Sequence, residues 1–449
     1  MKSLLTGAVL AALAPLALCA QADTVPLSLA EAQRVAAENN PQFRRTEADV
    51  ATAEAEVLRA RGAFLPSLSL GLRTGGSYSR RFTGVDQFGN TVVRDDPLDI
   101  KSSSAQQSLS LGQLTLFDGG ARQKDARAAR AGLQASQARV GTEGLRVRGE
   151  VERRYWDAVR ASSLIRLEEE LLRSARERLT ATQSLLRVGV RGPLDVLAAE
   201  VTVAEQEQAV ERARGDARRT ELDLRQSMGV LTGPPVALTD RPADPFDPAS
   251  LDAEALVARA LASHPRLMRT DAAARQAEYR LDAARANRWP RLTAGASLGR
   301  SQFFSDYSGL KEPNPLDQAA SFDLNLSYPI FSQYQNSARI QSARAGRDAA
   351  LEDTRGERLA VERDVRAALV ELRNAYAASA LAARSLELNR RRLELARRQY
   401  QVGSLTSTEL TDAVERAARA ERDALRTRYE FASALATLRE RTGETAAAP

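Results

Sequence analysis

The sequence contains almost no residues that build metal or redox sites. Among its 449 residues there is one cysteine, Cys19, and one histidine, His264. A disulfide framework needs at least two cysteines, and zinc sites need several cysteines and histidines together. No Gly-rich phosphate-binding loop follows a predicted strand, and no nucleophile–base pair stands out. The sequence therefore predicts no metal site, no cofactor and no enzymatic activity.

Aromatic residues and long apolar runs are also scarce. Aromatic residues make up only 5% of the chain, whereas alanine, leucine, arginine and glutamate dominate it, which suits long helices better than a thick globular core. Beyond the start of the chain, no segment approaches the apolar length of a membrane-spanning helix, roughly 18 residues or more. The 64 basic and 58 acidic residues give a net charge of +6. They are mixed along the chain, which indicates solvated helix faces and no nucleic-acid partner.

Residues 1–22 have the pattern of a secretory signal peptide. Lys2 precedes a mostly apolar stretch at 4–18, and residues 20–22 form an Ala-x-Ala cleavage site. Cleavage after Ala22 would remove Cys19 from the mature protein. Acylation of Cys19 is the alternative, but the bulky Leu18 stands where lipidation sites have a small residue.

The rest of the chain is a duplicated unit. Residues 36–72 match 260–296, and residues 114–131 match 328–345. Each copy is predicted to run helix, two strands, long helix, turn, helix. The predicted organisation is a first repeat at 23–231, a linker rich in proline and aspartate at 232–250, a second repeat at 251–443 and a tail at 444–449.

The predicted helices have matching lengths. The stretches 118–188 and 332–402 contain no proline and are equally long. Each would measure about 106 Å if it were helical throughout. The first copy's shorter helical stretches, 28–62 (interrupted near Pro41) and 193–228, together have that same length. Two short helices placed end to end would therefore match one long helix.

The predicted strands alternate apolar and polar residues, as in "SLSLGLR" (67–73) and "SFDLNLSYPI" (321–330). A phase slip near Gly112 predicts a β-bulge. Polar loops are expected at 83–101 and 305–317. Aromatic residues flank the strands at two levels, as membrane-interface residues do. They are Phe64, Phe117, Trp289 and Phe331 at one level and Phe82, Phe303, Phe304 and Tyr307 at the other.

Four such strands cannot form a membrane barrel alone, because an open sheet in lipid leaves edge N–H and C=O groups unpaired at several kcal/mol each. Alternating strands behind a signal peptide are typical of outer-membrane barrels. The sequence therefore predicts a mixed α+β membrane protein. Several copies would each contribute four strands to one outer-membrane β-barrel, which would have 12 strands if it is trimeric. The polar helices would form a periplasmic helical barrel.

Six motifs, taken together in a duplicated chain, resemble the TolC family of outer-membrane efflux and secretion channels. They are "NNPQF", "SHPRL", "LPSLSL", "WPRLTA", "LFDGG" and "YQVGSLTSTELTDA". The resemblance covers about residues 27–443. It implies a homotrimer in outer-membrane lipid that acts as a passive exit duct for efflux or type I secretion. A periplasmic adaptor protein and an inner-membrane transporter are the implied partners. The alternative is a periplasmic coiled-coil scaffold or adaptor that never enters a membrane.

Two Val-Gly pairs, Val188-Gly189 and Val402-Gly403, interrupt the long helices at equivalent positions of the two repeats. Glycine there is expected to form a turn with a backbone conformation that other residues avoid. The resemblance implies that these turns lie at the periplasmic tip and contact the adaptor. Both expectations can hold together.

Acidic residues follow each turn. Asp195, Glu409 and Asp412 are either helix-start acids favoured by the helix dipole or, as the resemblance implies, rings that line a closed constriction and favour cations. The resemblance also implies a gate lock in which Tyr400 takes part. Some relatives use an arginine where this chain has Leu405, and Arg191 is its counterpart in the first repeat.

His264 aligns with Asn40 in the first repeat, and both precede a proline. This position predicts a polar residue in a turn that starts a helix. His264 is therefore expected to be structural.

Overall fold

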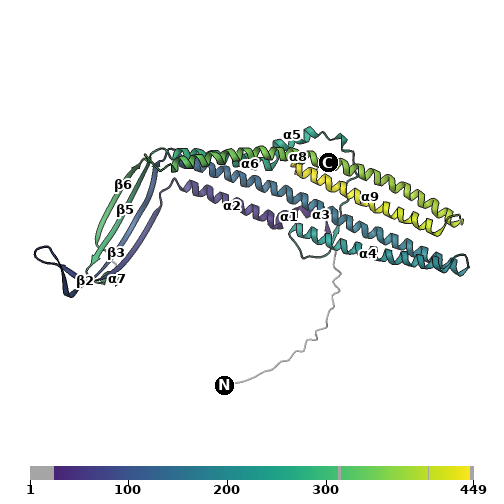
Figure 1. The fold of residues 1–449 in the computed structure, drawn as a ribbon, viewed down its shortest axis with the longest axis horizontal. Helices are drawn as coiled ribbons and strands as arrows, with labels where there is room; N and C mark the ends of the chain where they lie inside the picture. Colours follow the sequence, from purple (N-terminus) through teal and green to yellow (C-terminus); the bar gives the residue numbers. More distant parts are fainter. Residues whose placement is uncertain (1–24, 312–314, 403, 445–449) are drawn as a thin grey trace, which may run out of the picture.

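The computed structural model describes residues 25–311, 315–402 and 404–444. The molecule is elongated, with a β-sheet at one end and long helices over the rest of its length (Figure 1). The two longest helices, α3 (Ala121–Arg187) and α8 (Gln335–Gln401), contain 67 residues each, which corresponds to about 100 Å. Within the described residues, no helix combines the length and the apolar character needed to cross a membrane.

Shorter helices lie end to end beside the long ones. Helices α2 (Pro41–Gly62) and α4 (Pro193–Met228) follow one another along α3. In the second repeat, α6 (Pro265–Ala286) and α9 (Ser407–Thr442) follow one another along α8. The predicted stacking of two short helices beside one long helix is confirmed (Figure 1).

Each repeat has a corner of the same kind, where one short helix ends and the next begins. Helices α1 (Leu29–Asn39) and α5 (Ala253–Ser263) end just before Asn40 and His264. The Asn40 side chain accepts the backbone N–H groups at positions 42 and 43 and donates to the Ser227 carbonyl at 2.9 Å. Nδ1 of His264 accepts the N–H of Arg266 at 3.2 Å. The predicted helix-start role of His264 is confirmed.

Four antiparallel strands form the sheet in the order β2-β3-β5-β6. They are β2 (Leu68–Val85), β3 (Thr91–Phe117), β5 (Arg291–Phe304) and β6 (Asp317–Ser327). A register shift after Leu111 confirms the bulge expected near Gly112.

Two sequence-based strand limits were wrong. The loop expected at 83–101 is mostly strand, because β2 and β3 continue as a hairpin up to a turn at 86–90. There the Asp86 carboxylate accepts the N–H groups of Phe88 and Asn90, each at 2.8 Å, and this closes the turn. Strand β6 ends at Ser327 and does not reach Ile330, since Pro329 has no N–H to donate to a ladder.

The strand register gives the sheet one apolar and one polar face. Residues that pair across antiparallel strands point to the same face. The apolar face carries Leu68, Leu70, Leu72, Leu109, Leu111, Ala296, Leu298, Phe322, Leu324 and Leu326. On the polar face, serine hydroxyls pair across strands at 2.7–2.8 Å, as in Ser69–Ser110, Ser77–Ser102 and Ser297–Ser321.

The expected loop between β5 and β6 contains a short helix, α7 (Ser308–Lys311). It lies on the apolar face, at the end far from the long helices. The Ser103 hydroxyl accepts the N–H of Gly309 at 3.1 Å and donates to the Asp306 carbonyl at 2.7 Å, and Thr74 donates to the Gly309 carbonyl at 3.0 Å. These bonds satisfy strand hydroxyls that otherwise break the apolar face.

The segment predicted as a linker is tied back to the chain's beginning. Strand β4 (Val236–Leu238) pairs in parallel with β1 (Val25–Leu27). The buried Tyr155 of α3 donates its hydroxyl to the Leu27 carbonyl at 2.9 Å and accepts the N–H of Asp240 at 3.1 Å. This strand pair, which the sequence did not reveal, fixes the crossover between the repeats against the middle of α3.

Candidate functional site at the helix turns

The α3–α4 turn is closed by a backbone motif that requires glycine. Gly189 has a left-handed φ of +77°, a conformation that costs other residues roughly 1–2 kcal/mol. The N–H of Val190 donates to the Leu185 carbonyl at 2.9 Å, as in a Schellman C-cap. The side chains of Val188 and Val190 are exposed at the end of the molecule.

The α8–α9 turn repeats this geometry. The N–H of Ser404 donates to the Gln399 carbonyl at 3.0 Å, at the positions equivalent to Val190 and Leu185. Val402 is exposed like Val188, and Gly403 lies outside the described residues. The two turns lie at the same end of the molecule (Figure 1). Their contact with an adaptor remains a prediction.

Two of the predicted constriction residues start the outgoing helices. The Asp195 carboxylate accepts the N–H of Gly192 at 3.3 Å. The Glu409 carboxylate accepts the N–H and the hydroxyl of Thr406 at 3.0 and 2.8 Å, and Thr406 in turn accepts the N–H of Glu409. The Thr406 hydrogen bonds lower the pKa of Glu409, because they favour its charged form.

The third acid, Asp412, is held by two arginines. Arg392 of α8 lies 3.2 Å from one carboxylate oxygen, and Arg416 of α9 lies 2.9 Å from the other. All three predicted acids are therefore at the tip and bonded within their own hairpins. Whether they also line a constriction stays a prediction.

A contact joins the two turns. The Arg191 guanidinium lies over the Tyr400 ring, with its carbon 4.4 Å from the ring centroid. Such cation–π contacts contribute about 0.5–2 kcal/mol. The Nε atom of Arg191 is buried and has no hydrogen-bond partner among the described residues. Leu405, at the position where some relatives have arginine, packs with Tyr400 on the small apolar cluster of Ala396, Leu410 and Ala413.

A buried ion pair joins the two hairpins above the tip. Glu168 of α3 is only 3% exposed. Its carboxylate accepts two hydrogen bonds from Arg422 of α9, at 2.6 and 2.7 Å, and one from Gln206 of α4 at 2.5 Å. Burial alone would raise the pKa of Glu168, but these hydrogen bonds hold it below its ordinary value.

Sequence reasoning did not identify Glu168, although a signal exists. The residue falls in a heptad series whose other members, Ala161, Ala175 and Thr182, are small and buried. A carboxylate at such a seam position has to find a cation on the facing helix.

The predicted membrane-interface aromatics lie at both ends of the sheet. Trp289, exposed at the α6–β5 corner, packs against Gly119. At the far end, Phe82 lies at a β2 bulge, and the adjacent Phe303 and Phe304 point to opposite faces. Phe303 shares the polar face with the serine pairs, whereas Phe304 packs against Gly309 on the apolar face. Membrane contact by these four residues stays a prediction.

The backbone is strained just before α8, next to Phe331. Gln333 and Tyr334 have φ values of +51° and +64°. Their counterparts in the first repeat are Gly119 and Gly120, with φ values of +66° and +84°. The second repeat thus keeps the turn without glycine, and the Tyr334 ring packs edge-on against Phe331 with centroids 6.0 Å apart.

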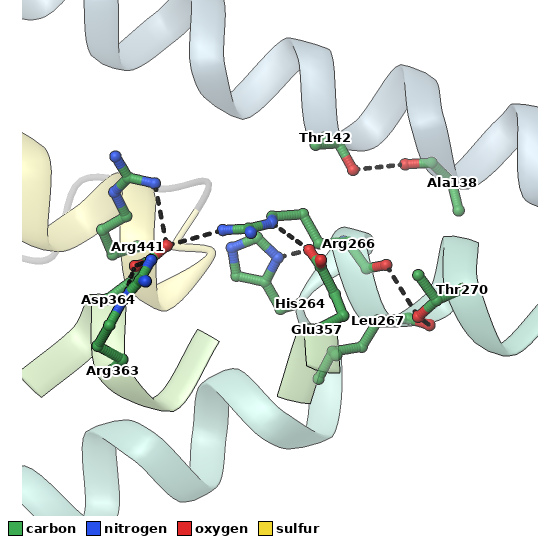
Figure 2. A network of polar contacts seen from close by, with 10 residues as sticks. All are labelled: Ala138, Thr142, His264, Arg266, Leu267, Thr270, Glu357, Arg363, Asp364 and Arg441. Atoms are coloured by element: carbon green, nitrogen blue, oxygen red, sulfur yellow. Dashed lines mark hydrogen bonds and ion pairs between the residues drawn. The ribbon is translucent and has the colours of Figure 1, made fainter. Parts of the chain in front are cut away.

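His264 lies inside an ion-pair network that joins three helices (Figure 2). Arg266 of α6 bridges Glu357 at 2.5 Å and Asp364 at 2.9 Å, both on α8. Arg441 of α9 also contacts Asp364, at 3.3 Å. Burial, and then the positive charge of Arg266, lower the pKa of His264 despite the opposing Glu357.

Replacing His264 with asparagine, the residue of the first repeat, is expected to remove an acid-dependent loss of stability. Because the folded pKa lies below the ordinary value of 6.5, the unfolded chain binds a proton first. Wild-type stability should therefore fall relative to His264→Asn as the pH drops below about 6.5. Thermal unfolding of both proteins between pH 8 and pH 5 measures this. Parallel curves would contradict it.

Known proteins are similar to this chain in sequence. Residues 33–230 and 256–444 match the model of a family described as outer membrane efflux protein. Protein CyaE of Bordetella pertussis is 30% identical over 353 residues, which cover 78% of this chain and 70% of CyaE. The outer membrane efflux protein BepC of Brucella suis is 24% identical over 68% of this chain and 61% of its own length.

The fold has a counterpart among solved structures. A membrane protein from Pseudomonas aeruginosa superposes with a TM-score of 0.75 at 21% identity, over 92% of this chain and 93% of that one. At this identity the likeness concerns the fold: a mixed α+β architecture of long helices with strands at one end.

Proposed function

This chain belongs to the outer membrane efflux protein family, and on that premise we propose that it is a passive trimeric exit duct gated at its helix turns. It is an outer-membrane channel protein whose helical part lies in the periplasm. In the proposal, an adaptor docks on the exposed turns at Val188 and Val402 and links the duct to an inner-membrane pump. The duct serves efflux or type I secretion and performs no catalysis of its own.

The main support for the proposal is that a single chain leaves its β-sheet open at both edges. Within the described residues, the sheet of β2-β3-β5-β6 has two unpaired edges and an exposed apolar face. In lipid, each unpaired edge group costs several kcal/mol. Closure with neighbouring copies removes both edges, and three copies supply twelve strands. A scaffold that stays in the periplasm would leave the exposed leucines of this face in water.

The helices are incomplete in the same way. One seam of α8 packs inside the protomer through Val365, Leu369 and Leu372. A second heptad seam on α8 is exposed, with Leu381, Leu388 and Leu395 each more than half accessible. Helix α4 exposes a similar stripe at Leu194, Leu197 and Val201. Exposed heptad seams favour helix partners, and neighbouring protomers supply them in a closed ring.

The Arg191–Tyr400 contact suits a closed tip. It ties the α3–α4 turn to α8 one residue before that helix ends, so spreading the hairpins has to break it. At about 1 kcal/mol per protomer, three such contacts bias the tip toward closure by about 3 kcal/mol. That bias corresponds to roughly a hundredfold in the closed-to-open ratio.

The proposal is tested by single-channel recording of Tyr400→Leu in planar bilayers. The variant removes the π face while keeping an apolar side chain, so open probability is expected to rise strongly, up to about a hundredfold if wild-type channels are mostly closed. Arg187→Ala is the matched control, because among the described residues the Arg187 side chain bonds only to Ser184 of its own turn. Equal open probability in wild type and Tyr400→Leu would remove this contact from the gate.

A further inference from the structure

The two edge strands of the sheet carry charges of opposite sign on the polar face. Strand β2 carries Arg73 and Arg81 there, and strand β6 carries Asp317 and Asp323. Each of the four lies an even number of residues from the paired serines of its own strand, so it points to the same face. Within the described residues, the paired stretches of β3 and β5 add one charge to this face, Arg291, which lies four residues closer to the helices than the Asp323 row.

None of the four edge charges is neutralised inside the chain. All four side chains are exposed, and among the residues that the structure describes none of them forms an ion pair or a side-chain hydrogen bond. By contrast, Arg80, on the opposite face of β2, pairs with Asp99 of β3 at 3.0 Å. The unpaired cations therefore lie along one edge strand and the unpaired anions along the other, so the two edges are complementary in charge.

A closed barrel restricts how these two edges can meet. Four strands spaced about 4.8 Å apart span about 19 Å, so a strand tilt of about 35–45° displaces a hydrogen-bonded row by about 13–19 Å along the strands before it reaches the next copy. At about 3.4 Å per residue, this displacement is a slip of about 4–6 residues. The slip has to be even, because an odd one would turn the apolar side chains to the wrong face.

The extent of the strands decides the direction of the slip. The row through Asp323 ends at Ser67, at the start of β2 in the same chain. A slip of six toward the far end of the sheet places Asp323 opposite Arg73 of the next copy, and β6 is then paired over its whole length with residues 69–79. The opposite slip would bring β6 beside residues 57–67, which belong to α2 and the corner after it.

The same register matches the remaining side chains of the two edges. Asp317 stands opposite Ser79, one diagonal step from Arg81, and diagonal neighbours lie within reach of long side chains. On the apolar face, leucines meet leucines. These apolar pairs are Leu324 with Leu72 and Leu326 with Leu70. No charged residue faces one of like sign, so one register satisfies both faces of the sheet.

We propose that β6 of each copy pairs with β2 of the next in the register that sets Asp323 against Arg73. The inference rests on the proposed function, since it requires a closed trimer. The partner of each edge is thus a second copy of this chain, and three seams hold six ion pairs on the polar face. Exposed ion pairs add little free energy each. Their effect here is to select one register over those displaced by two residues.

Introduced cysteines can measure this register, because the sequence after residue 22 contains no cysteine. The double variant Arg73→Cys/Asp323→Cys, purified in detergent and oxidised, is expected to form disulfides between copies and to give covalent trimers in denaturing gels without reductant. Arg73→Cys/Asp317→Cys is the matched control. These two residues share one row within a single chain, so they would cross-link only if the barrel closed without slip. In the proposed register they lie about 20 Å apart, beyond the reach of a disulfide.

Charge reversal tests the ion pair itself. Arg73→Asp should lower the temperature at which the trimer dissociates, because like charges directly opposite are destabilising, and Arg73→Asp/Asp323→Arg should restore it. Disulfides in the control pair, no disulfide in either pair of a trimeric protein, or a double reversal no more stable than Arg73→Asp would each overturn the inference. A monomeric wild-type protein would instead refute the proposed function.

Discussion

Replacing Arg422 with alanine is expected to loosen the two hairpins by about 3 kcal/mol. In the wild-type protein Glu168 is only 3% exposed, and without Arg422 its carboxylate keeps Gln206 as its one side-chain partner among the described residues. Breaking a buried ion pair costs about 3–5 kcal/mol, and we take the low end because the Arg422 side chain is 35% exposed. Amides of α3 and α9 around this pair should exchange with deuterium roughly a hundredfold faster.

Arg419→Ala provides the control on the same helix. Arg419 pairs with Glu415 on the surface, where their side chains are 71% and 55% exposed, and such pairs contribute about 0–1 kcal/mol. Its exchange pattern should stay close to that of wild type. If both variants exchange at the same rate, the buried pair does not hold the hairpins together.

The same pair predicts an acid effect. Because hydrogen bonds hold the pKa of Glu168 below its ordinary value, the pair stabilises the fold above the unfolded glutamate pKa of about 4.3. This contribution is lost as the pH falls through the folded value. Arg422→Ala should therefore differ most from wild type near neutral pH and least in strong acid.

Replacing Leu388 with aspartate is expected to abolish the trimer. Leu388 lies in the middle of the exposed α8 seam, so closure of the ring would bury three copies of it. Each buried leucine contributes about 1.5–3 kcal/mol, and each carboxylate buried in its place adds a cost of several kcal/mol. The measurement is mass by light scattering in detergent, where the variant should give the mass of one chain.

Asn389→Asp is the matched control for charge. It adds the same negative charge one residue along, about 100° around the helix, without touching the leucine seam. In the part of the chain that the structure describes, the Asn389 side chain bonds only within its own helix, to Ser385. This variant should remain trimeric. A trimeric Leu388→Asp protein would show that the seam does not lie between protomers.

Much of the architecture was predictable because the sequence is periodic within each strand and helix and is duplicated along the chain. Pro41, Pro193 and Pro265 indicated helix starts, and the 214-residue offset shared by the long helices and the turns correctly equated the turns after Leu185 and Gln399. The alternation of apolar and polar residues correctly located all four long strands of the sheet. These features depend on local backbone chemistry, which the residue types determine directly.

The sequence was less informative where distant segments meet. The hairpin at 83–101 was missed because its polar residues resemble a loop, yet ladder hydrogen bonds hold them extended. Strand β4 forms only because β1, from the start of the first repeat, lies beside it. At the tip, sequence showed the acids but not their partners. Arg392 and Arg416 reach Asp412 only once α8 and α9 pack together.

In the proposed function, one chain is a third of a closed duct. Native mass spectrometry of the protein released from detergent, with single-channel recording of the same preparation, tests it most directly. We expect one species of three times the mature chain mass that conducts ions across a bilayer. A monomeric or dimeric species, or a trimer that does not conduct, would contradict it.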